Sequence, residues 1–62
     1  MQPVGVIGLG RMGMGVIGRL RNAGHPVVGY DISRESRAAA EHHGIAVVHT
    51  LKELAQRVRI IF

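Results

Sequence analysis

Three glycines with a fixed spacing separate two apolar segments near the start of the sequence. The segment Gly8-Leu9-Gly10-Arg11-Met12-Gly13 has the pattern Gly-x-Gly-x-x-Gly; a short β-branched run precedes it and residues with helical spacing follow it. A strand that turns tightly into a helix leaves backbone N–H groups free at the helix start, where the helix dipole also favours negative charge. The segment therefore predicts a phosphate-binding turn.

Each glycine has a separate expected role in such a turn. Gly8 permits the tight turn out of the strand, Gly10 lets a pyrophosphate reach the backbone, and Gly13 lets the helix lie close to the sheet. We expect the anion to be bound mainly by backbone N–H groups, namely those of Leu9, Arg11 and Met12.

A carboxylate lies where a dinucleotide site needs one. Asp31 ends a second β-branched run, 21 residues after Gly10, and can accept hydrogen bonds from the adenosine ribose hydroxyls. It would repel the 2′-phosphate of NADP, so the sequence favours NAD as cofactor over NADP. Arg34 leaves an alternative open, because its guanidinium could meet a 2′-phosphate or lie against the adenine. In the opposing interpretation the glycines serve packing alone and Asp31 caps a loop.

The elements that must position these residues alternate between strand and helix. Strands are expected at residues 4–7, 27–31, 45–48 and within 57–62. Helices are expected to begin at Arg11, after a Ser33 cap and after a Thr50 capping box, and Gly24 and Gly44 are expected to end the first two. Right-handed crossovers then give an α/β fold of Rossmann type, with a parallel sheet in the order 3-2-1-4.

The apolar pattern also predicts which residues face the core. In the first helix the expected apolar face comprises Met12, Val16, Ile17 and Leu20. In the third helix it comprises Leu51, Leu54, Ala55 and Val58. Three further glycines are assigned to close packing, namely Gly5, Gly15 and Gly18.

Composition excludes several classes of function. The 62 residues contain no cysteine, so disulfides, zinc–thiolate sites and thiol nucleophiles are excluded. The net charge of +4 is spread over three segments without interleaved aromatic residues, which argues against nucleic acid as a partner. The four histidines lack partners at ligand spacing, so no metal site is expected. We identify no signal peptide or membrane segment and expect a cytoplasmic protein.

The predicted sheet is incomplete. Three helices cannot cover both faces of four parallel strands well, and the fourth strand would be a hydrophobic edge. We therefore expect residues 1–62 to be a partial N-terminal dinucleotide-binding domain, truncated in its fourth strand, or a chain that pairs with another. The substrate domain is expected to be absent.

The segments "VIGLGRMG" and "AGHPVVGYD" resemble the start of the 6-phosphogluconate and 3-hydroxyisobutyrate (beta-hydroxyacid) dehydrogenases. The resemblance is greatest to the NAD-preferring bacterial 6-phosphogluconate dehydrogenases. It implies a Rossmann domain followed by a helical domain that forms a homodimer. It also implies hydride transfer to the nicotinamide, with decarboxylation of the sugar acid to ribulose 5-phosphate. Ile32 lies where NADP-using members have an arginine, which again favours NAD.

No residue here matches the family's catalytic lysine or its substrate motif, so no catalytic residue is predicted. The cofactor-binding residues are expected to be Gly8, Leu9, Gly10, Arg11, Met12, Gly13, Asp31 and Ile32. Within the enzyme class, the alternative is a beta-hydroxyacid dehydrogenase that acts on a smaller acid such as 3-hydroxyisobutyrate. The alternative from another class is a non-catalytic NAD-sensing module.

Overall fold

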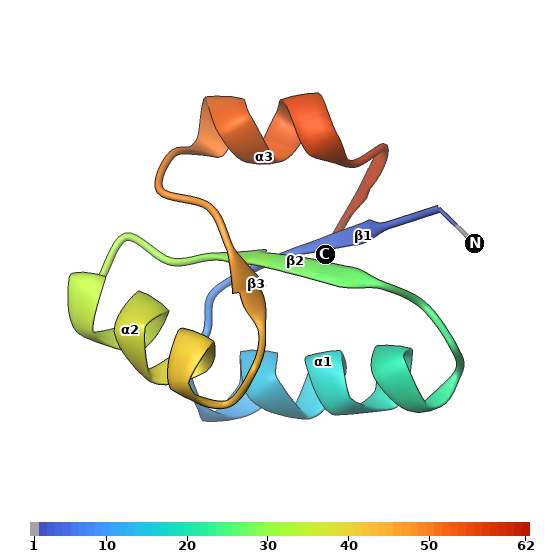
Figure 1. Cartoon of the computed structure of the whole chain (residues 1–62), viewed down its shortest axis with the longest axis horizontal. Helices are drawn as coiled ribbons and strands as arrows, with labels where there is room; N and C mark the ends of the chain where they lie inside the picture. The colour runs from blue at the N-terminus through green and yellow to red at the C-terminus, as the bar shows by residue number, and fades with distance from the viewer. Residues whose placement is uncertain (1) are drawn as a thin grey trace.

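Strands and helices alternate along the whole chain (Figure 1). The computed structural model describes residues 2–62. Its elements are β1 (Val4–Ile7), α1 (Arg11–Asn22), β2 (Val27–Tyr30), α2 (Arg34–His42), β3 (Ala46–Val47), α3 (Leu51–Arg57) and β4 (Ile60–Ile61). All the strand pairs are parallel, and the sheet order is β3-β2-β1-β4. The predicted α/β class and strand order are therefore confirmed.

Strand β1 lies in the middle of the sheet and pairs along its full length with β2, from Val4 opposite Val27 to Ile7 opposite Tyr30. On its other side it pairs with the short strand β4. The ladder continues past β4, because the N–H of Ile7 donates to the carbonyl oxygen of Phe62 at 2.9 Å. The chain adds β2 and β3 on one side of β1 and then β4 on the other, so the strand order reverses beside β1, and open α/β sheets bind ligands outside the carboxyl ends of strands at such a point.

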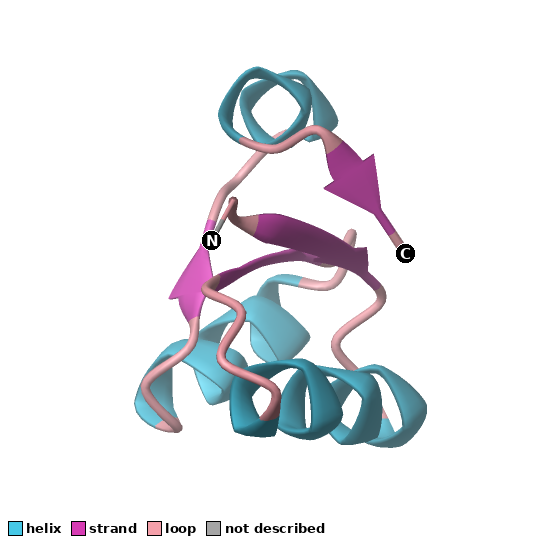
Figure 2. Cartoon of the chain, turned by 90° about the vertical axis from the view of Figure 1, so that its right-hand side faces the viewer, coloured by secondary structure: helices cyan, strands magenta, loops and turns pink. Residues whose placement is uncertain are grey.

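Helices cover both faces of the sheet. Helices α1 and α2 lie on one face and α3 lies on the other (Figures 1 and 2). The buried core is divided in the same way. One cluster contains Val6, Leu9, Ile17, Ala40 and Ile45. The other contains Val28, Val48, Leu54 and Val58.

Two of the helices begin with the predicted side-chain caps. Ser33 Oγ accepts a hydrogen bond from the N–H of Ser36 at 3.2 Å, and Thr50 Oγ1 accepts one from the N–H of Glu53 at 3.0 Å. The Glu53 carboxylate accepts a hydrogen bond from the N–H of His49 at 3.3 Å, one residue before the cap. At the other ends of α1 and α2, Gly24 and Gly44 have φ of 91° and 83°, in the left-handed region that favours glycine.

Three residues expected in the core are exposed. Met12 is 88% exposed and Leu51 is 52% exposed, and Ala55 is exposed as well. Met12 and Leu51 lie in the first turns of their helices, beyond the carboxyl edge of the sheet, where no second layer covers them. Helical spacing identifies the side of a helix but not the point along it where the sheet ends. Strand bounds differ too: β2 ends at Tyr30, and β3 comprises two residues.

The glycines assigned to packing divide into two groups. A β-carbon at Gly5 would lie 2.8 Å from Val58 Cγ2, so the close approach of α3 to β1 requires glycine there, as predicted. A β-carbon at Gly15 or Gly18 would meet no atom within 4 Å, so the packing role predicted for these two is wrong. Gly13 differs again, because a β-carbon there would overlap the carbonyl oxygen of Gly8. The predicted close approach at Gly13 is confirmed.

Two alanine substitutions in α1 should change stability in opposite directions. Gly13→Ala places a methyl group against backbone that cannot move aside, and overpacking of this kind costs about 1–3 kcal/mol. Gly15→Ala, two residues later, enters open space and should stabilise the helix by about 0.5–1 kcal/mol. Denaturant unfolding of both variants measures the difference. Equal effects would contradict the assigned close approach of α1 to the turn.

Candidate functional site

The turn from β1 into α1 has the geometry that its glycines predict. Gly8 has φ of 95°, a backbone conformation that residues with side chains rarely adopt. Its N–H donates to the carbonyl oxygen of Tyr30 at 2.8 Å, so the turn is held against the end of β2. The tight turn expected at Gly8 is thus present, and it directs the chain into α1 at the carboxyl edge of the sheet.

The first turn of α1 has features that favour a bound anion. The first hydrogen bond that joins it runs from the N–H of Met14 to the carbonyl oxygen of Gly10 at 2.9 Å, so the N–H groups of residues 11–13 have no partner within the helix. No side chain caps this end, and no acidic residue lies in its first turn. Arg11 lies there instead. A cation at the positive end of a helix dipole is unfavourable unless a negative charge is nearby.

Gly10 has no structural reason to be glycine within the described chain. Its φ of −76° and ψ of −166° are extended values open to any residue, and a β-carbon there would meet no atom within 4 Å. The missing side chain leaves the backbone accessible from outside. This open space, next to the unpaired N–H groups, fits a pyrophosphate that contacts the main chain.

The Asp31 carboxylate connects the turn to the end of β2. Its Oδ2 accepts a hydrogen bond from the N–H of Leu9 and its Oδ1 accepts one from the N–H of Ser33, both at 2.7 Å. The Leu9 bond, the Ser33 bond and the nearby Arg37 charge together hold the pKa of Asp31 below its ordinary value of 3.8, although desolvation opposes them. Asp31 is therefore ionised at neutral pH.

Leu9 differs from its expected role. Its N–H, expected to point at the phosphates, donates to Asp31, and its side chain is buried over Gly29. A β-carbon at Gly29 would lie 2.7 Å from Leu9 Cδ2, so this glycine makes room for the leucine. Of the three backbone groups expected to bind phosphate, those of Arg11 and Met12 remain.

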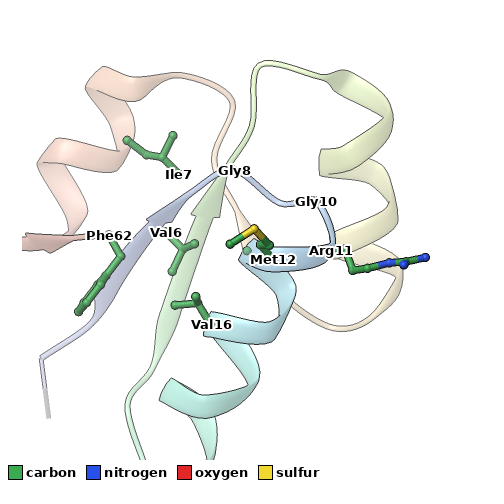
Figure 3. Close-up of a pocket in the computed structure, with 9 residues that line it drawn as sticks. Val6, Ile7, Gly8, Gly10, Arg11, Met12, Val16 and Phe62 are labelled. Carbon is green, nitrogen blue, oxygen red and sulfur yellow. The ribbon is translucent and has the colours of Figure 1, made fainter.

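Two cavities lie on either side of the end of β1. The first has a volume of about 540 Å³ and is lined by Val6, Ile7, Gly8, Gly10, Arg11, Met12, Gly13, Val16 and Phe62. The second has a volume of about 400 Å³ and is lined by Ile7, Gly8, Tyr30, Asp31, Ile32 and Leu51. Figure 3 shows the first cavity, with the Arg11 side chain extended away from the strand. The cavities share Ile7 and Gly8, so both lie at the carboxyl end of β1, and the two are together called the crevice.

The structure brings most of the predicted residues to this crevice. Of those predicted from the sequence, the first cavity takes Gly8, Gly10, Arg11, Met12 and Gly13, and the second takes Gly8, Asp31 and Ile32. The sequence interpretation missed the apolar walls, namely Ile7, Tyr30, Leu51 and Phe62. Their only signal was an apolar residue at the last position of a strand or the first of a helix.

The two arginines in the first half of α2 are placed differently from each other. Arg34, for which a contact with the cofactor was considered, is exposed and lines neither cavity. Arg37, which the sequence did not single out, donates from Nη1 to the carbonyl oxygen of Asp31 at 2.7 Å and to that of Ile32 at 3.2 Å. No local motif marks such a contact, because it depends on how α2 turns back onto the end of β2.

Within residues 2–62, no cluster of three or more histidine, cysteine or acidic side chains could hold a metal ion. None of the helices in the same range combines the length and apolar character needed to cross a membrane.

Sequence comparison assigns the chain to a family. The family described as "NAD binding domain of 6-phosphogluconate dehydrogenase" matches residues 3–62. The chain belongs to this family. A relative from Haloferax volcanii, named "6-phosphogluconate dehydrogenase, NAD(+)-dependent, decarboxylating", is 46% identical to this NAD-binding domain over 55 residues. The match covers 89% of the chain and 18% of the relative, so the domain spans less than a fifth of that enzyme's length. The resemblance inferred from the glycine segment is confirmed.

The ionised Asp31 should make stability depend on acid pH. A carboxylate whose pKa is lowered by folding stabilises the native state above its unfolded value, and the contribution is lost as pH falls through the folded pKa. Asp31→Asn should therefore be less stable than the parent protein at neutral pH, and the difference should shrink below pH 3.8. Urea unfolding of both proteins across this range tests the prediction. A difference that stays constant or grows on acidification would contradict it.

Proposed function

We propose that the crevice at the carboxyl edge binds NAD, with the pyrophosphate at the start of α1 and the adenosine ribose at Asp31. The observation that carries this is the open space at Gly10 beside unpaired N–H groups, where neither conformation nor packing requires glycine. Membership in a family of NAD-binding domains supports it. The N–H groups of Arg11 and Met12 bind the phosphates in this proposal. The absence of a side chain at Gly13 lets the first turn of α1 lie close to Gly8.

The second cavity favours NAD over NADP. Each oxygen of Asp31 accepts one backbone hydrogen bond, and the lone pairs that remain can accept the two ribose hydroxyls. Ile7, Ile32 and Leu51 supply apolar surface for the adenine, and each is about half or more exposed. A 2′-phosphate would meet an ionised carboxylate and these apolar side chains, and no basic side chain lines this cavity.

The parent protein, in our proposal, oxidises and decarboxylates 6-phosphogluconate to ribulose 5-phosphate. NAD, when bound, supplies the acceptor for the hydride that leaves the substrate carbon. Residues 1–62 bind and orient the cofactor, and the sugar acid is held by a substrate domain outside them. The 46% identity to an enzyme named for this reaction supports the proposal. We further propose that the parent protein is a cytoplasmic homodimer that has no nucleic-acid partner.

The open space at Gly10 provides a direct test of cofactor binding. Gly10→Val should lower stability by no more than about 1 kcal/mol, because its β-carbon meets no protein atom and the cost is that of an unfavourable residue at the N-cap of α1. It should weaken NAD binding at least about tenfold, or about 1.4 kcal/mol, because the side chain occupies the path of the pyrophosphate. Isothermal titration calorimetry on the intact protein measures this. Gly18→Ala, also in open space but late in α1, is the matched control and should bind NAD normally. Normal binding by Gly10→Val would refute the proposed site.

The substrate is tested by turnover of the intact protein. We expect NADH to form together with CO₂ when 6-phosphogluconate is supplied, and to form much more slowly with 3-hydroxyisobutyrate. Faster turnover of 3-hydroxyisobutyrate would show instead a beta-hydroxyacid dehydrogenase. Binding of NAD without turnover of either acid would favour a non-catalytic NAD-sensing module.

A further inference from the structure

Arg37 donates hydrogen bonds to the backbone that follows β2. The Nη1 atom of this α2 residue donates to two successive carbonyl oxygens, that of Asp31 at 2.7 Å and that of Ile32 at 3.2 Å. Packing does little to hold the same segment, because the Ile32 side chain is 88% exposed. The segment is therefore fixed largely by hydrogen bonds, and Arg37 supplies those that come from α2.

The Arg37 guanidinium lies near the backbone after β2 and the Tyr30 ring. It lines neither cavity, and its Cζ lies 6.0 Å from the centre of the Tyr30 ring. Its Nε is buried, and among residues 2–62 no hydrogen-bond partner faces it. A side chain held in this way fixes the backbone of Asp31 without itself lining the second cavity.

We propose that Arg37 is a positioning residue that sets the cofactor preference of the site by holding the Asp31 carboxylate in place for the ribose. This rests on the proposed binding of NAD at Asp31. Hydrogen bonds weaken steeply with misalignment, so a carboxylate that must accept two ribose hydroxyls depends on the placement of its backbone. The N–H groups of Leu9 and Ser33 donate to the side-chain carboxylate of Asp31, and Arg37 donates to its backbone carbonyl oxygen.

Three roles for Arg37 predict different changes in the ratio of NAD to NADP affinity. If it positions Asp31, its loss weakens NAD binding and leaves NADP binding nearly unchanged, because NADP gains little from the carboxylate; the ratio falls. If it attracts the 2′-phosphate by charge, its loss weakens NADP binding and the ratio rises. If it only stabilises the fold, both affinities change together and the ratio stays constant.

The experiment measures both affinities by calorimetry on the intact protein and on Arg37→Met, which keeps the length of the side chain without its donors. We expect NAD affinity to fall about tenfold, the order of one lost hydrogen bond to a charged group, and the ratio to fall with it. Arg57→Met removes the same charge from α3, far from both cavities, and should leave the ratio unchanged. A constant or rising ratio in Arg37→Met overturns the proposal.

Two further variants complete the test. Arg37→Lys keeps the charge and can donate to one of the two carbonyl oxygens. Its ratio of NAD to NADP affinity should therefore lie between those of the parent and Arg37→Met. If Arg37→Met does not fold, an unchanged ratio in Arg37→Lys overturns the proposal. Asp31→Ala should lower the ratio directly. If the parent protein shows no preference for NAD and Asp31→Ala has no effect, the proposed site fails. If both behave as expected and only the Arg37 variants retain the parent ratio, the role of Arg37 alone fails.

Discussion

The Asp31 carboxylate, held between the N–H groups of Leu9 and Ser33, is the interaction on which the site depends. It joins the turn after β1 to the connection between β2 and α2, which lies 22 residues later in the sequence. Because the Leu9 N–H is engaged, the turn cannot rotate without breaking a hydrogen bond to a charged group, which is among the stronger contacts in proteins. The same residue that is proposed to recognise the ribose therefore also shapes the phosphate-binding turn.

The start of α1 shows how function and stability compete in this fold. Helices α2 and α3 begin with hydroxyl caps, and each has a glutamate in its first turn. Helix α1 begins at Gly10 with neither, and Arg11 occupies its positive end. A serine in place of the N-cap glycine would stabilise the helix by a few tenths of a kcal/mol, but its side chain would occupy the space and the N–H groups that the proposed phosphate site needs. In the proposed site, the bound phosphate supplies the stabilisation that a side-chain cap would otherwise give this helix end.

Local signals predicted what local chemistry controls. Gly8 forms the expected turn, Gly24 and Gly44 end helices as expected, and Ser33 and Thr50 cap helices, because each effect is decided within a few residues. The strand order followed from the handedness of the crossovers. The errors arose where three-dimensional placement decides. The exposure of Met12 depends on where the sheet ends, and the engagement of the Leu9 N–H depends on a residue 22 positions away. The contact of Arg37 with the backbone after β2 depends on the angle at which α2 packs.

The last residues of β1 form a wall common to both cavities, since Ile7 and Gly8 line each of them. A ligand with two linked groups can bind in both cavities at once. When one group is bound, the other is confined near its own cavity at a high effective concentration. Neither group needs to bind tightly by itself. In the proposed site, preference for linked adenosine and pyrophosphate over the two groups supplied separately thus follows from the geometry of a single strand end.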